Sequence, residues 1–179
     1  GGRRGFGVTV AEPLKDDTGG AVSSTRIRDA LSVGDVADAN ALLGWRWQVD
    51  GTVQHGDKRG RELGFPTANL ALPEGTALAH GIYAVRVRVD GRLYDGVASY
   101  GRRPTFDDGL PLFEVHLFDF AGDLYGRPVT ASLVAHLRPE EKFASVEALV
   151  RQMDRDCADA RAVLAGLTPL SALDEAMTF

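Results

Sequence analysis

The chain has 179 residues, 44% of them apolar, which is enough for one packed domain or for one domain and part of another. Its 20 Lys and Arg are outnumbered by 25 Asp and Glu, and the net charge of −5 argues against nucleic acid or an anionic membrane as the main partner. A single cysteine, Cys157, excludes an intrachain disulfide framework, and no apolar run reaches the length of a membrane span. We therefore expect a soluble cytoplasmic protein.

The first 43 residues contain only short elements. Residues 6–10 alternate like a strand but have no partner strand before them, so we expect the chain to be a piece of a longer protein. Helical patterns follow at residues 23–31 and 35–43, and the second begins at the acidic cap Asp35 and stops at Gly44.

The start of the first of these helices, VSSTRIR at 22–28, is rich in hydroxyl and basic side chains. Either Ser24 or Thr25 can cap the helix, and the free backbone N–H groups with Arg26 and Arg28 would then form a corner that binds phosphate. Most helix starts of this composition are only caps, so the residues alone leave both interpretations open.

From Trp45 onward the pattern changes to the period of two that is typical of strands. A first strand is expected at residues 45–53. Two pairs of alternating segments are interpreted as hairpins: residues 83–89 with 93–100 around the turn Asp90-Gly91, and residues 113–120 with 129–137 across the connection 121–127. Several short strands without helices between them predict a closed antiparallel β-barrel, whose closure also removes exposed sheet edges.

One longer helix is expected after the strands. Apolar residues recur at three- and four-residue spacing from Val146 to Leu164, with Ser145 as the cap and Gly166 as the stop. The apolar stripe of this helix should pack against the barrel. Residues 168–179 form a tail whose order the pattern does not decide.

The stretch GFPTANL at 64–70 carries the first candidate site. In an extended segment residues two apart point to the same face, so Thr67 and Asn69 should project side by side. A hydroxyl and a carboxamide are neutral oxygen ligands that suit Mg²⁺ when a phosphate supplies most of the compensating charge, so a magnesium nucleotide is the first ligand to consider. Alternatively, Pro66 and Asn69 simply shape the end of a strand.

Glu114 is the second candidate, because its neighbours along the strand are large and apolar. It should share one face with His116, Phe118 and Phe120, and either face is a costly place for a carboxylate without a partner. A carboxylate in such surroundings can act as a general base. An edge position, with Glu114 in solvent, explains the pattern equally well.

Two polar connections could cover a ligand. Residues 54–63 are basic and spaced by glycines, so their backbone N–H groups and Lys58, Arg59 or Arg61 can close over an anion. Residues 101–111 form a long connection with glycines near both ends, as functional lids often do. Both stretches could equally be solvated turns.

Assembled in this way, the chain resembles the C-terminal part of bacterial bifunctional riboflavin kinase/FMN adenylyltransferases, also called FAD synthetases. The matching stretches, in the family's order, are GFPTANL (64–70), GIYAV (81–85), GVASYGRRPTF (96–106), EVHLFDF (114–120), DLYG (123–126) and LRPEEKF (137–143). The resemblance implies that residues 44–166 are the kinase module, a mainly β fold. This module would be a six-stranded Greek-key antiparallel barrel with a C-terminal α-helix, preceded by short helices and followed by a tail at 167–179.

The same resemblance implies that ATP phosphorylates the ribityl 5′-hydroxyl of riboflavin, giving FMN and ADP with Mg²⁺ as cofactor. Thr67 and Asn69 would ligate the metal, and Glu114 would accept or orient the hydroxyl proton. The ATP site would consist of His55, Gly56, Lys58, Arg59, Gly60, Pro66, Thr67 and Asn69. On the riboflavin side, Glu114 would be joined by Arg138 and Phe143.

Residues 1–43 would then be the C-terminal remnant of the adenylyltransferase module with its linker helices. VSSTRIR resembles the late phosphate-binding motif of that module, and its candidate contacts are Ser23, Ser24, Thr25 and Arg28. The early histidine signature of the module does not occur in the chain. We therefore predict a kinase only, whose partner is the missing N-terminal half of a parent protein that also makes FAD.

Two other functions are compatible with a barrel. A non-catalytic carrier or sensor of flavin or nucleotide would keep a pocket but would not need Glu114 beside the metal pair. Riboflavin-dependent consumption of ATP would separate it from a kinase. A barrel that binds nucleic acid is disfavoured by the acidic composition and by the lack of a basic, aromatic strand face.

Overall fold

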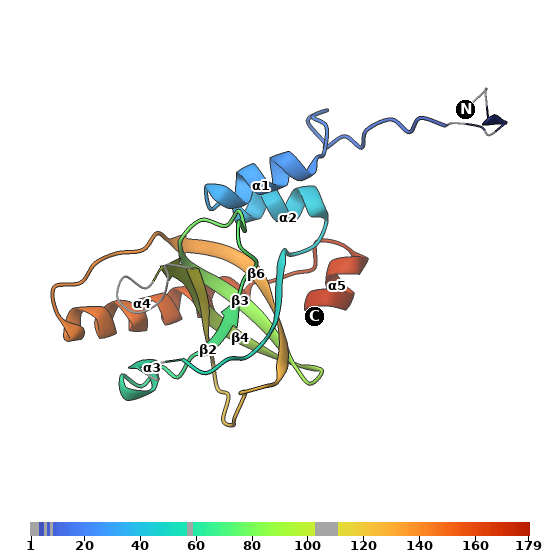
Figure 1. Cartoon of the computed structure of the whole chain (residues 1–179). Coiled ribbons are helices and arrows are strands. Elements are labelled where there is room, and N and C mark those ends of the chain that lie inside the picture. The colour runs from blue at the N-terminus through green and yellow to red at the C-terminus, as the bar shows by residue number, and fades with distance from the viewer. Residues whose placement is uncertain (1–3, 6, 8, 57–58, 103–110) are drawn as a thin grey trace.

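The computed structural model describes residues 4–5, 7, 9–56, 59–102 and 111–179, and only the backbone of Arg59. Lys58 and most of the connection 101–111, both singled out above, lie outside the described residues. The described part forms a β-barrel with helices around it (Figure 1). Its elements are α1 (Ser24–Ser32), α2 (Val36–Leu43), β1 (Gln48–Thr52), α3 (Arg59–Glu62), β2 (Ala68–Ala71), β3 (Gly81–Val89), β4 (Arg92–Arg102), β5 (Pro111–Leu117), β6 (Pro128–Arg138), α4 (Val146–Ala165) and α5 (Ala172–Thr178).

The six strands form one antiparallel sheet in the order β1-β6-β3-β4-β5-β2. Its two ends meet where the chain beyond β1 reaches β2, because the N–H of Gln54 donates to the carbonyl oxygen of Asn69 at 2.9 Å. Since β6 returns to lie beside β3, strands β3 to β6 form a Greek key. The predicted fold class is therefore confirmed: a mainly β, six-stranded Greek-key barrel with a C-terminal helix.

The first predicted hairpin is confirmed. β3 and β4 pair in continuous register, from Gly81 opposite Tyr100 to the last pair before the turn. Asp90 and Gly91 have φ values of 46° and 77°, the left-handed conformation that both central residues of a two-residue type I′ turn require.

The second predicted hairpin is wrong. β5 pairs with β2 and β4, whereas β6 pairs with β1 and β3, so segments 113–120 and 129–137 are not neighbours. The connection between them binds to the chain just after β1 instead. Val53 donates its N–H to the carbonyl of Arg127 at 3.0 Å, and Gly126 donates to the carbonyl of Val53 at 2.9 Å. These bonds bring the end of the connection beside the end of β1, so the first residue of β6, Pro128, pairs with Thr52 of β1.

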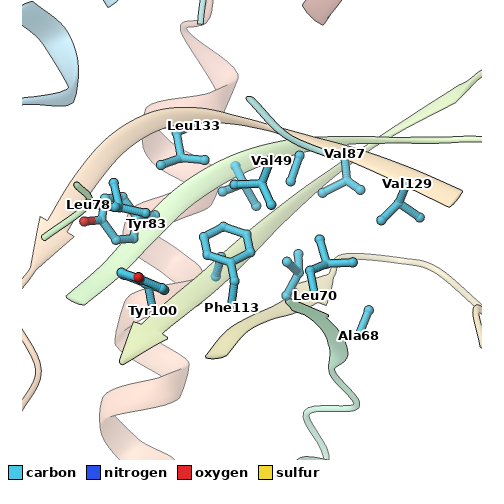
Figure 2. Close-up of a cluster of buried hydrophobic side chains, with 14 of the residues drawn as sticks. Val49, Ala68, Leu70, Leu78, Tyr83, Val87, Tyr100, Phe113, Val129 and Leu133 are labelled. Atoms are coloured by element: carbon cyan, nitrogen blue, oxygen red, sulfur yellow. The ribbon is translucent and has the colours of Figure 1, made fainter. Parts of the chain in front are cut away.

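Side chains from alternate strand positions fill the barrel (Figure 2). Its largest fully buried members are Tyr83, Phe113, Leu70, Leu133, Val85, Val87 and Val115. On β5, Phe113 and Val115 point into this core, and Glu114 and His116 consequently point to the outer face of the sheet. The outer face of β5 is the one that carries the candidate site.

The predicted face of Glu114 is correct except at its far end. β5 ends at Leu117, and Asp119 has a φ of 55°, which takes the chain out of the strand. Phe118 packs under α4 on the outer side, whereas Phe120 packs against the main core cluster. The alternation that was extended to Phe120 therefore stops before it.

The two N-terminal helices form as predicted, with one change at a cap. Ser23, not Ser24 or Thr25, caps α1: Ser23 is extended, and its hydroxyl accepts a hydrogen bond from the N–H of Arg26 at 3.3 Å. Ser24 and Thr25 already belong to the first turn. α2 begins and ends at the predicted caps. The strand predicted at residues 6–10 is not formed at its described positions.

α4 follows its predicted cap Ser145 and lies against the outside of the barrel (Figure 1). Ala160 on its buried side packs against Phe118. The tail, which the sequence left undecided, contains a further helix, α5, whose Asp174 is fully buried. Across the described ranges, no helix is both long and apolar enough to cross a membrane.

Candidate active site

A cavity of about 410 Å³ lies over the outer face of the barrel. It is lined by strands β2 to β6, by residues 60–67, by residues 138–143 and by α4. Segments that are far apart in sequence therefore meet around one space. A concave site of this size suits a small molecule.

A row of five directly paired residues crosses the sheet at this cavity. Asn69 on β2 pairs with Glu114 on β5, and Glu114 pairs with Ser99 on β4. Ser99 pairs with Ile82 on β3, which pairs with Arg138 on β6. Directly paired residues project to the same face of a sheet, and all five line the cavity. The row thus sets a carboxamide, a carboxylate and a hydroxyl side by side.

Glu114 does not lie at a sheet edge, because β5 runs between β2 and β4. With the Asn69 amide oriented so that both its ends are satisfied, its Nδ2 donates to Glu114 Oε1 at 2.9 Å and its Oδ1 accepts from the N–H of Gly56 at 3.2 Å. The Asn69 side chain is only 4% exposed, so these bonds satisfy a buried amide. The alternative with Glu114 at an exposed edge is excluded.

The oxygen atoms beside this pair fit a magnesium ion. Thr67 and Asn69 both line the cavity, as their two-residue spacing predicts. Asn69 Oδ1, which accepts from the N–H of Gly56, and the Thr67 hydroxyl are both neutral oxygens on the side of the cavity that carries Glu114. A hydroxyl and a carboxamide suit Mg²⁺ that is shared with phosphate oxygens. The described residues contain no group of three or more His, Cys, Asp and Glu that could hold a metal by themselves.

The candidate nucleotide loop is described only in part. His55 does not line the cavity itself but stacks on Tyr125, which does, with the two ring centroids 3.8 Å apart. Lys58 and the side chain of Arg59 lie outside the described residues.

Two glycines of this loop lie where a side chain has no room. A Cβ added to Gly56 would collide with the carboxamide of Asn69, and one added to Gly60 would collide with the carbonyl oxygen of Phe65. Gly60 and Pro66 line the cavity. The loop is therefore packed closely onto the residues that flank β2.

Arg138, at the far end of the row, is held by a buried carboxylate. Its Nε and Nη2 donate to the two oxygens of Asp156 on α4 at 2.7 and 2.6 Å, and Gln152 donates to Asp156 at 2.9 Å. The hydrogen bonds to Asp156 raise the pKa of Arg138. The guanidinium lies 5.8 Å from the ring centroid of Phe143, and both residues line the cavity. Since Asp156 already compensates its charge, Arg138 is fixed in place.

The candidate phosphate contacts on α1 stand apart from this cavity. Its four residues, Ser23, Ser24, Thr25 and Arg28, are exposed, and none of them lines the cavity. The neighbouring Arg26 pairs with Asp16 at 2.7 Å. The barrel cavity and the start of α1 are thus separate features.

Several cavity residues were given no role from the sequence, among them Ser99, Tyr125 and Cys157. Ser99 alternates outward as expected for its strand, but only the pairing of β4 with β5 brings it beside Glu114. Tyr125 lines the cavity and connects it to the candidate nucleotide loop by stacking on His55. Cys157 also lines the cavity, and burial raises the pKa of its thiol to about 11, which keeps the thiol protonated at neutral pH and unsuited as a nucleophile.

The fold and the cavity define a β-barrel whose outer face carries a cavity of a size that suits small molecules. Within that class, the chain belongs to the riboflavin kinase family, because the family model described as "Flavokinase: Riboflavin kinase" matches residues 43–164. This match covers the whole barrel and nearly all of α4.

Curated relatives carry the name bifunctional riboflavin kinase/FMN adenylyltransferase. The protein of Pseudomonas fluorescens is 45% identical over 163 residues, which are 90% of this chain and 52% of the relative. The protein of Listeria monocytogenes is 42% identical over 164 residues, with the same two coverages. The chain spans about half the length of the curated relatives it matches.

Two solved structures share the fold. A Streptococcus pneumoniae protein described as a macrolide-efflux protein has a TM-score of 0.75 and 40% identity, over 87% of this chain and 50% of that one. The riboflavin kinase of Trypanosoma brucei has a TM-score of 0.50 and 23% identity, over 73% and 84% of the two chains, and supports the fold alone. The description of the Streptococcus pneumoniae protein as an efflux protein differs from the family match and from the names of the curated relatives.

Proposed function

We propose that the chain transfers the γ-phosphoryl group of ATP to the ribityl 5′-hydroxyl of riboflavin, giving FMN and ADP. The observation that carries the proposal is the direct pairing of Asn69 with Glu114, next to Thr67, in the cavity of a riboflavin kinase family member. This pairing places a candidate general base beside the candidate ligands of the nucleotide-bound cation.

Thr67 and Asn69 would hold Mg²⁺ together with the phosphates of ATP. When bound, the ion would neutralise charge on the transferred group. Pro66 and the loop residues His55, Gly56, Lys58, Arg59 and Gly60 would surround the nucleotide. Gly56 contributes by leaving room for the Asn69 carboxamide and by donating its N–H to it.

Glu114 would accept or orient the proton of the attacking hydroxyl. The ribityl oxygen forms a bond to the γ-phosphorus, the bond from that phosphorus to the bridging oxygen of ADP breaks, and the proton passes to the carboxylate. Because Asn69 holds one oxygen of Glu114, the carboxylate is oriented before the substrate binds. Arg138 and Phe143 would contact the flavin at the other end of the row.

The wider assignments are also proposals. Residues 44–166 would be the kinase module, residues 1–43 the end of an adenylyltransferase module and its linker, and 167–179 the tail. The longer parent protein would also convert FMN to FAD in the cytoplasm. The chain spans about half the length of these relatives, and we assign the formation of FAD to the parent protein as a whole.

The test is an assay with riboflavin and Mg-ATP in which the products are separated by chromatography. We expect FMN without FAD from the chain, and no FMN from the Asn69→Ala and Glu114→Ala variants. Formation of FAD would contradict the assignment of residues 1–43 as an incomplete module. Tight binding of flavin or nucleotide without any FMN would favour a carrier instead.

Gly56→Ala is expected to weaken binding of Mg-ADP about tenfold, because its new methyl group displaces the Asn69 carboxamide. Calorimetric titration with ADP and Mg²⁺ measures the effect. Gly166→Ala is the matched control, since a Cβ at Gly166 meets no atom within 4 Å. Equal affinity in the two variants would show that the close approach of Gly56 does not matter for the nucleotide.

A further inference from the structure

His116 stands two residues after Glu114 on β5, on the same outer face, and lines the same cavity. Its Nδ1 lies 2.9 Å from the carbonyl oxygen of Pro66. Because a carbonyl oxygen can only accept, Nδ1 carries the hydrogen in this contact. The histidine therefore ties β5 to the chain segment that leads into β2.

Two aromatic rings also contact the imidazole. Phe65 meets it edge-on with centroids 5.5 Å apart, and Phe118 does so at 5.9 Å. These contacts restrict the rotation of the imidazole. Packing therefore restrains the ring in addition to the hydrogen bond to Pro66.

The peptide that accepts this bond is the one that leads to Thr67. The Pro66 carbonyl shares a rigid plane with the N–H of Thr67, so a bond to that oxygen restrains the position of the Thr67 backbone. Thr67 precedes the first residue of β2, so it lies outside the paired part of that strand. A hydrogen bond from His116 supplies a restraint that strand pairing does not.

We propose that His116 is a positioning residue, which sets the distance between Thr67 and Glu114 through the Pro66 carbonyl. This inference rests on the proposed function, because it assigns Thr67 to the nucleotide-bound cation and Glu114 to the hydroxyl proton. His116 acts through Pro66 and touches neither reacting group. A role limited to packing between Phe65 and Phe118 is the competing explanation.

Three variants separate the two explanations. His116→Asn keeps a donor nitrogen one bond from Cγ, where Nδ1 stood, whereas His116→Gln moves the donor one bond further out. His116→Phe keeps a ring between Phe65 and Phe118 but has no donor. We expect the Kd of His116→Asn for Mg-ADP to lie within about threefold of that of the unsubstituted chain. The Phe and Gln variants should need about tenfold more Mg²⁺ for half-maximal ADP binding.

The measurement is calorimetric titration of ADP at a series of Mg²⁺ concentrations, with ADP alone as the reference and a thermal melt of each variant. In the FMN assay, kcat should fall in the Phe and Gln variants, while KM for riboflavin should stay within about twofold. The inference is overturned if ADP binding by the Phe variant depends on Mg²⁺ as it does in the unsubstituted chain. It is also overturned if the Asn variant needs as much Mg²⁺ as the Phe variant. If the unsubstituted chain makes no FMN, the proposed function fails. The Mg²⁺ titration still decides whether His116 restrains this site.

Discussion

Glu114→Gln is expected to lower kcat for FMN formation about 100-fold while changing the Kd for Mg-ADP by less than about threefold. Glutamine keeps an oxygen that can accept from Asn69 Nδ2, so the pairing of β2 with β5 across this row is preserved. What is lost is the basic group that takes the hydroxyl proton. In a loose transition state for phosphoryl transfer, the attacking hydroxyl has transferred little of its proton to the base. The expected loss in kcat is therefore at the low end of what general-base catalysis contributes.

Two measurements isolate this effect. Single-turnover formation of FMN reports the chemical step, and calorimetry with ADP reports the nucleotide site. Glu74→Gln, the same change at an exposed residue, should leave both unchanged. Equal losses in turnover and in nucleotide affinity would contradict a base role and would make Glu114 a binding group.

Local signals in the sequence were sufficient where an element is set by its own residues. The turn at Asp90-Gly91 needs two left-handed residues, and Asp-Gly is a pair that permits this, so the β3–β4 hairpin was predictable. The ends of α2 and α4 follow from their caps in the same way. The partner of β5 was not predictable, because alternation gives the face of a strand and not its neighbour.

The candidate site shows the same division. Thr67 and Asn69 are two residues apart, so their shared face follows from strand geometry. The contact of Asn69 with Glu114 depends on register between strands that are far apart in sequence, and so does the place of Ser99. Asp156, which holds Arg138, gave no signal because it sits among charged residues of a helix whose docking angle decides which of them are buried.

The largest stability effect is expected at Asp174 on α5, in the tail whose order the sequence left open. Its carboxylate pairs with the Arg46 guanidinium and accepts from the N–H groups of Arg46 and Leu170 at 3.0 and 2.9 Å. The Asp174 side chain is fully buried, so Asp174→Asn leaves the Arg46 charge without its partner. Breaking a buried pair from one side costs about 3–5 kcal/mol, which lowers Tm by about 10 °C for a chain of this size.

The matched control is Asp95→Asn, whose carboxylate pairs with Arg86 at 2.9 Å but is 38% exposed. A pair of this kind contributes about 0–1 kcal/mol, so Tm should change by only a few degrees. If the two variants melt at the same temperature, the buried pair does not hold the tail on the barrel.

The pH dependence of this stability has a definite sign. Burial alone would raise the pKa of Asp174, but the N–H groups of Leu170 and Arg46, the Thr178 hydroxyl and the Arg46 charge together hold it below its usual value. A carboxyl whose pKa is lower in the folded state stabilises the fold above its unfolded pKa of about 4, and this contribution is lost as the pH falls through the folded value.

The Tm difference between the unsubstituted chain and Asp174→Asn should therefore be largest near neutral pH. It should shrink below about pH 4, because the unsubstituted chain loses the charge that the variant lacks. Thermal melts across this range measure it, and a constant difference would mean that the variant is destabilised by lost packing and not by lost charge.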